Sequence, residues 1–287
     1  DVFSMSIKLR GSGAIDDIVF NTCNGGCGGE PHFQPWTGHR YYFMGECDAV
    51  MLASKEVDVH MRTSIKDFYS YIEAAAVRVG NSIMEMSIGE TNSFIINGQD
   101  FTTADLPLEI EGKYMLEEGA EVTHGTGTNY VLKLGGCNIE MRVMKYIMAV
   151  EFKGSLESFH EGTGGVTGAF PSGELLGRDG TTEFAFDGVS KTIHGKQEPI
   201  CNSIGQEWQV RDTDPQLFRE IREPAWPRQC ELPKAEASAV RRRLTTSIDM
   251  DAASEACAQV HSKDSADFDF CVMDVVMMDD VNAAYAW

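Results

Sequence analysis

Cysteine is the residue type with the clearest chemical meaning in this chain. The sequence has eight cysteines. They lie along the whole length, at Cys23, Cys27, Cys47, Cys137, Cys201, Cys230, Cys257 and Cys271. The absence of a Cys-x-x-Cys pair disfavours a zinc site, and an even number of distant cysteines is typical of disulfides made in an oxidising compartment. Spacing alone leaves the connectivity open, since eight cysteines allow about 105 pairings.

A catalytic role is considered first for Cys27 and His32. A thiol beside an imidazole is the arrangement found in cysteine nucleophiles. In a disulfide-bonded protein, however, the cysteine is more often oxidised and the histidine then packs or caps a strand. His60 lies on the polar face of a predicted strand and is expected to be solvated, and no Gly-x-Ser-x-Gly motif occurs. We therefore expect no catalytic site.

Residues 161–180 contain seven glycines and raise the question of a phosphate-binding loop. The segment lacks the Gly-x-x-x-x-Gly-Lys-Ser/Thr pattern, and the glycines around Gly164 lack the third position of a dinucleotide-binding motif. The composition instead predicts a region of structured turns.

The basic cluster Arg241-Arg242-Arg243 stands out in an acidic chain. Three interpretations remain open. The cluster is a processing site, with cleavage between Arg243 and Leu244, or an intramolecular clamp on the acidic tail, or an ordinary exposed helix face.

Charge and hydropathy narrow the function classes. The formal net charge is −20, which disfavours nucleic acid and anionic membranes as partners. It suits divalent cations, basic partners or simple solubility. Apolar residues make up 43% of the chain, enough for a folded core. No apolar run has the length of a membrane-spanning helix, so we expect no membrane insertion.

Alternating apolar and polar residues predict β strands. Such runs cover 57–62, 84–88, 139–143 and 146–152. A period of two is typical of strands with one buried face. Turn signals such as Asn97-Gly98 and Gly135-Gly136 separate the runs. Many short strands with regular turns predict a mainly β fold, an antiparallel β sandwich.

Helical periodicity appears only near the end of the chain. Residues 253–260 and 268–275 carry apolar side chains at helical spacing, with Cys257 and Cys271 on the apolar faces. This predicts two short helices linked by a Cys257–Cys271 disulfide. Residues 215–222 begin with proline and predict another short helix. We expect a β domain over 1–225, a linker containing prolines and arginines over 226–248, and an acidic helical module over 249–287.

Four segments, in order, resemble the von Willebrand factor type D domain. They are the Cys-Gly-Gly-Glu-Pro-His-Phe opening that starts at Cys27 and continues to Cys47, Gly165–Phe170, Gly205–Val210, and Cys257 with Cys271–Val275. The last resembles the cysteine-bearing helical region that follows such domains. The amino-acid sequences of these motifs are similar to variants found in secreted proteins of diatoms and related algae.

The resemblance implies particular pairings and ligands. It implies a Cys47–Cys230 disulfide. Thr167 replaces the motif cysteine, so Cys23 or Cys27 needs another partner, with Cys137 and Cys201 as candidates. The resemblance also implies a calcium site, for which Glu174 and Asp179 are the ligands to expect. The alternative is that Asp179-Gly180 is simply a tight turn.

The resemblance further implies an extracellular, mostly non-enzymatic protein. We expect a structural or adhesive module of a matrix, cell surface or filament, which acts through protein–protein contacts and self-assembly. Edge strands and cysteines would support that assembly. The alternative function is a calcium- or ligand-binding module of the cell surface, and a secreted enzyme ranks last. No cofactor is required by this account.

Overall fold

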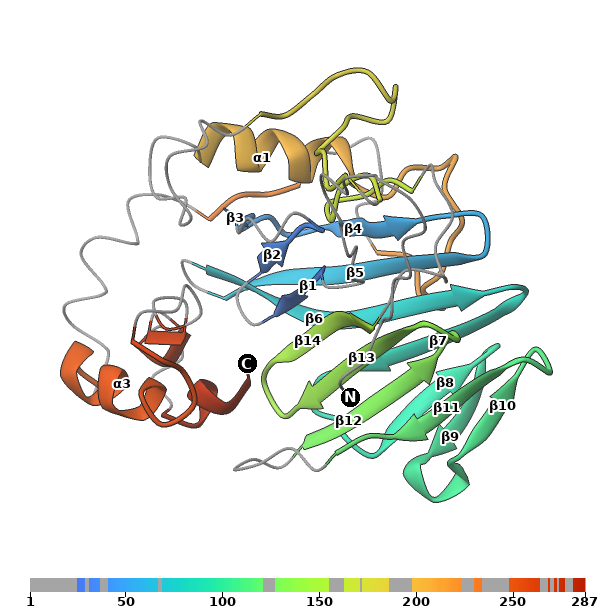
Figure 1. The fold of residues 1–287 in the computed structure, drawn as a ribbon, viewed down its shortest axis with the longest axis horizontal. Coiled ribbons are helices and arrows are strands. Elements are labelled where there is room, and N and C mark those ends of the chain that lie inside the picture. Colours follow the sequence, from blue (N-terminus) through green and yellow to red (C-terminus); the bar gives the residue numbers. More distant parts are fainter. Residues whose placement is uncertain are drawn as a thin grey trace, which may run out of the picture.

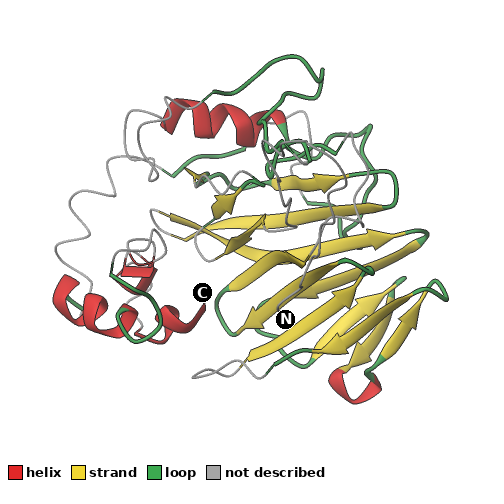
Figure 2. Cartoon of the chain, in the orientation of Figure 1, coloured by secondary structure: helices red, strands yellow, loops and turns green. Residues whose placement is uncertain are grey.

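The structure is a computed structural model of a mainly β protein with few helices (Figures 1 and 2). Two antiparallel sheets form its body, as the strand periodicity predicted. The residues that the structure describes are 25–28, 31–36, 41–66, 69–120, 127–154, 163–170, 172–185, 198–222, 230–233, 248–263, 268, 271–272, 274–276 and 281–286.

The larger sheet has eight strands in the order β10-β11-β12-β13-β14-β1-β2-β3. In chain order they are β1 (Gly25–Gly28), β2 (His32–Gln34), β3 (Tyr41–Tyr42), β10 (Leu108–Ile110), β11 (Tyr114–Glu118), β12 (Gly127–Lys133), β13 (Cys137–Met144) and β14 (Met148–Gly154). The smaller sheet has six strands in sequence order. They are β4 (Asp48–Ala53), β5 (Val57–Lys66), β6 (Tyr69–Val79), β7 (Ser82–Ser87), β8 (Ser93–Ile96) and β9 (Gln99–Thr102).

Most of the topology is a meander. From β4 to β9 and from β10 to β14, each strand pairs with the next one along the chain. A short 3-10 helix, η1 (Thr103–Asp105), connects the two sheets between β9 and β10. Among the described strands, β1 and β14 form the one pair that is not consecutive, with Cys27 opposite Val150. This pairing joins the N-terminal strands to the end of the meander.

The core lies between the sheets and follows the predicted alternation. On β5, Val59 and Met61 are buried in the main core, and on β13, Ile139 and Met141 occupy the same layer. The methionines of β7, such as Met84, also pack there. The period-two pattern therefore predicted both the strands and their buried faces.

Helices are few and only partly predicted. They are α1 (Glu198–Glu207), α3 (Met250–Cys257) and the 3-10 helix η3 (Val281–Ala286), and residues 271–272 and 274–276 are also helical. The prediction of helix over 215–222 was wrong, because this segment runs without helix along the six-stranded sheet, where the Arg219 N–H donates to Glu85 Oε2 at 2.8 Å. None of the described helices is long and apolar enough to cross a membrane.

The C-terminal helical residues have a small core of their own. Ala253, Cys257, Cys271 and Val275 pack together in a cluster separate from the main one. Asp249 caps α3 by accepting the Ala252 N–H at 2.8 Å. In Figure 1 the orange α3 and the red residues after it lie beside the sheets.

Candidate functional site

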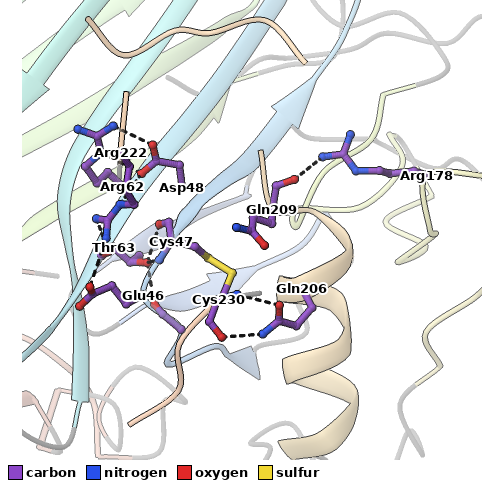
Figure 3. The surroundings of a disulfide bond; sticks show 11 residues. Glu46, Cys47, Asp48, Arg62, Thr63, Arg178, Gln206, Gln209, Arg222 and Cys230 are labelled. Carbon is purple, nitrogen blue, oxygen red and sulfur yellow. Dashed lines mark hydrogen bonds and ion pairs between the residues drawn. A yellow bond between two sulfur atoms is a disulfide. The ribbon is translucent and has the colours of Figure 1, made fainter. Parts of the chain in front are cut away.

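A network of hydrogen bonds surrounds the Cys47–Cys230 disulfide, just before the start of β4 (Figure 3). The structure has this pair, which the family resemblance implied, with the two Cα atoms 5.0 Å apart. Gln206 of α1 donates from Nε2 to the Cys230 carbonyl and accepts the Cys230 N–H at Oε1, both at 3.0 Å. The Cys47 N–H donates to Thr63 Oγ1 at 3.2 Å. The disulfide therefore joins two backbones that are each fixed by another element.

The glycine-rich segment lies along the outer side of β4. The Gly164 and Ala53 backbones bond to each other, and the Val166 N–H donates to the Val50 carbonyl at 3.0 Å. Gly165 has φ +124, and a Cβ there would lie 2.4 Å from the Met51 carbonyl oxygen. This close approach requires glycine. The segment is thus structured, as predicted, and these amides bind β4.

Aromatic side chains from two other motifs donate to the same segment. Tyr41 Oη donates to the Val166 carbonyl at 2.5 Å, and Trp36 Nε1 donates to the Gly168 carbonyl at 3.0 Å. Trp208 Nε1 donates to the Leu176 carbonyl at 2.9 Å. Burial, with a contribution from the neighbouring thiols of Cys201 and Cys27, raises the pKa of Tyr41 well above its ordinary value. The hydroxyl therefore stays protonated and remains a donor.

Phe43 links the opening motif to the motif that contains Trp208. A Cβ at Gly45 would lie 2.1 Å from the Phe43 ring, and a Cβ at Gly205 would lie 2.4 Å from it. The ring is fully buried. Two glycines that the family motifs contain are thus needed for packing around one phenylalanine.

Arg178 connects the glycine-rich region to residues after α1, and sequence reasoning missed it. Its guanidinium donates to both oxygens of Asp214, at 2.7 and 2.8 Å, and to the carbonyls of Glu207 and Gln209. It also lies over the Trp208 ring, 4.9 Å from the centroid. The Arg-Asp-Gly tripeptide gave no signal of this, because every partner is distant in sequence.

Cys27 and His32 are both buried, at 3% exposure each. His32 Nε2 lies 3.2 Å from Asp274 Oδ1, a residue of the C-terminal helical module. Burial, and secondarily the Asp274 carboxylate, raises the pKa of Cys27 well above its ordinary value. A thiol that keeps its proton is a poor nucleophile. His32 therefore links β2 to a helical residue near the end of the chain, and burial keeps the Cys27 thiol protonated.

The remaining cysteines are distributed as follows. Cys257 and Cys271 form a disulfide with a Cα–Cα distance of 5.9 Å, the pair that the helical spacing predicted. Cys137 is disulfide-bonded, and Cys201 is buried in α1. Cys27 carries a thiol. The alternative in which Cys27 forms a disulfide with Cys137 or Cys201 is therefore wrong. Cys23 lies outside the described residues.

The two expected calcium ligands have local roles. Asp179 accepts the Thr181 and Thr182 N–H groups, both at 2.8 Å, and the Thr182 hydroxyl at 2.6 Å. These bonds, led by that hydroxyl, hold the pKa of Asp179 far below its usual range. Glu174 accepts from Ser172 Oγ at 3.2 Å. Within the described ranges, no three His, Cys, Asp or Glu side chains are grouped to hold a metal ion. The geometry favours the tight turn, and calcium binding remains a prediction.

Two further predictions concern the processing site after Arg243 and the exposure of His60. The proposed processing site at Arg243 and Leu244 lies outside the described residues, as does most of the linker. The prediction that His60 is solvated was wrong, because its exposure is 1%. The polar face of β5 is covered by residues that come after α1.

A comparison with protein-family models finds no match, and none of the curated proteins is similar in sequence.

Proposed function

We propose that this chain is an extracellular structural or adhesive module, built on a β domain like that of von Willebrand factor type D, and that it acts through protein–protein contacts. One observation carries the proposal. Aromatic side chains singled out by the sequence motifs bond to backbone carbonyls of the glycine-rich segment, which itself bonds to β4, and the Cys47–Cys230 disulfide adjoins the start of that strand. Such an arrangement keeps the shape of the domain fixed, which suits a protein that acts through contacts of its surface with other proteins.

The disulfides support the extracellular location. Cys47–Cys230 joins residues 183 apart in sequence, and Cys257–Cys271 closes the helical module. Bridges of this kind persist in oxidising compartments and are rare in reducing ones. The buried, protonated Cys27 thiol is compatible with the same location.

The sheet edges suggest which contacts assembly would use. The outer side of β4 is covered by bridges from Gly164 and Gln209, and Glu231 bridges Glu46 just before the strand. On β9 the Asp100 side chain is 83% exposed, and charged edges oppose strand addition. We therefore propose contacts between side-chain surfaces in place of the edge-strand pairing expected from the sequence.

Sedimentation velocity over a concentration series of non-reduced protein tests this function. The proposal predicts that the weight-average sedimentation coefficient rises with concentration as copies associate. A control variant, Asp100→Asn, removes a charge from the β9 edge and should leave the rise unchanged. A chain that stays monomeric over the whole series would contradict self-assembly.

A further inference from the structure

His60 lies in a row of ionisable residues on the outer face of β5. The row is Asp58, His60 and Arg62, while the residues between them face the core. Asp58 forms an ion pair with Arg78. Arg62 donates to Asp48, with both bonds at 2.8 Å. His60 lies between these pairs, and its Nδ1 has no hydrogen-bond partner among the described residues. A buried polar group in this state costs free energy and calls for an explanation.

Residues 208–222, here called the strap, run along this face after α1. The strap begins on the edge of β4, where the Val50 N–H donates to the Trp208 carbonyl at 2.8 Å. Leu217 and Phe218 then pack against Ala74 and Ala76 of β6. His60 pairs with Val50 on one side and Ala76 on the other, so it lies between these two contact regions. Because His60 is 1% exposed and Asp214 of the strap acts on its charge, the strap is the segment placed to cover this face of β5.

Arginines hold the strap at three points. Arg178 pairs with Asp214, at 2.7 Å. Arg62 lies over the Phe218 ring, 4.3 Å from its centroid. Near the strap's end, Arg222 pairs with Asp48 at 3.1 Å. These arginine contacts are polar or lie at the surface of the sheet, whereas Trp208 at the start of the strap belongs to the main core, so the part of the strap after Val210 is the part free to open.

Burial is the largest influence on His60, and charged groups of both signs surround it. Asp58 on its own strand, Asp48 on β4 and Asp214 on the strap favour an imidazolium, and Arg178 opposes it. Each of these carboxylates already has an arginine partner. Burial therefore dominates and lowers the pKa of His60 to about 4.

We propose that His60 makes the strap acid-sensitive, so that protonation of the buried imidazole opens the strap from the six-stranded sheet and deprotonation closes it. An imidazolium needs water or a hydrogen-bond acceptor, and the closed strap gives Nδ1 neither. Opening exposes the ring to solvent.

The direction of the pH effect follows from the two pKa values. In the open strap His60 regains its ordinary pKa of 6.5, whereas in the closed strap it is about 4. The open form therefore binds more protons between these values. The closed strap is fully favoured above pH 6.5 and loses stability as the pH falls toward 4.

A disulfide limits how far the strap opens, and opening exposes apolar residues of the sheet. The Cys47–Cys230 disulfide ties the chain beyond the strap to β4, so an open strap stays near its site. Opening uncovers Ala74 and Ala76, which are buried and packed against Leu217 and Phe218 when the strap is closed. This acid-dependent opening of the strap does not depend on the proposed function.

Hydrogen exchange of the strap tests the proposal. Amide protection in residues 211–222, corrected for intrinsic exchange rates, is compared at about pH 7.5 and about pH 5. The two pKa values predict protection roughly thirty-fold lower at the acidic pH. Protection in β12 and β13 should stay the same. Unchanged protection of the strap in the wild-type protein would overturn the proposal, with no variant required.

Two variants assign the effect to His60. His60→Gln and His60→Phe cannot be protonated, so each should abolish the pH dependence of the strap. His32→Gln is the matched control, because it removes another buried histidine on the other sheet and should retain the thirty-fold change. A pH response that persists in a folded His60 variant would also overturn the proposal.

Discussion

Phe43 is packed between Gly45 and Gly205, two glycines from different sequence motifs. The same pattern recurs at the Gly165 backbone, where β4 leaves no room for a side chain. Tyr41, Trp36 and Trp208 use their polar atoms to bond carbonyls of the neighbouring segment. At the scale of residues, the motifs are therefore explained by packing and backbone hydrogen bonds.

Substitution of Gly205 separates packing from helix propensity. Gly205 lies in α1, where alanine alone would stabilise the helix by about 1 kcal/mol. The new Cβ would meet the Phe43 ring at 2.4 Å, however, and overpacking costs about 1–3 kcal/mol. We expect Gly205→Ala to have a lower free energy of unfolding in urea. Gly98→Asn is the control, because Gly98 faces open space and asparagine tolerates its positive φ. A stabilised Gly205→Ala protein would contradict the packing account.

Asp179 offers a test of the calcium prediction. Asp179→Ala removes the bonds to Thr181 and Thr182, so it should lower the melting temperature. Because those bonds are internal to the turn, we expect the same decrease in calcium and in EDTA. A decrease that appears only in calcium would identify Asp179 as a ligand and refute the turn interpretation.

At the scale of elements, sequence patterns predicted those strands whose conformation depends on residues nearby in the chain. The strands that contain Val59, Met86 and Met141 alternate because each has one buried face. The same reasoning failed for residues 215–222, where contacts with Arg62 and Glu85 decide the conformation. It also missed α1, although Pro199 in its first turn is a helix-start signal. The buried His32–Asp274 contact joins residues 242 apart, and no spacing rule reaches so far.

The C-terminal module should depend on its own disulfide. The Cys257–Cys271 bridge closes a short loop, with a sequence separation of 14, which corresponds to about 3 kcal/mol of stabilisation. Since α3 has only eight residues, it is marginal alone. We expect Cys257→Ala/Cys271→Ala to lose amide protection over residues 250–257, while β12 and β13 keep theirs.

Cys27→Ala is the matched control for that experiment, because it removes a buried cysteine without breaking a disulfide. It should leave protection in α3 unchanged. If the double variant retains protection in α3, the disulfide is not what stabilises the module.

At the scale of the whole molecule, long-range links tie together two sheets whose strands pair mostly with their neighbours along the chain. One is the β1–β14 ladder, and another is the Cys47–Cys230 disulfide. By the chain-entropy estimate, a disulfide across 183 residues is worth about 5 kcal/mol. The family resemblance anticipated the disulfide but not Gln206 or Arg178, which reach their partners only in the folded chain.

The two disulfides fix the structural cluster around β4 and the helices near the end of the chain. Alkylation of the native protein without reduction, followed by peptide mapping, tests this arrangement most directly. We expect Cys47–Cys230 and Cys257–Cys271 as bridged peptides, with Cys27 alkylated only after unfolding. Alkylation of Cys47, Cys230, Cys257 and Cys271 before any reduction would contradict both the structural cluster and the extracellular proposal.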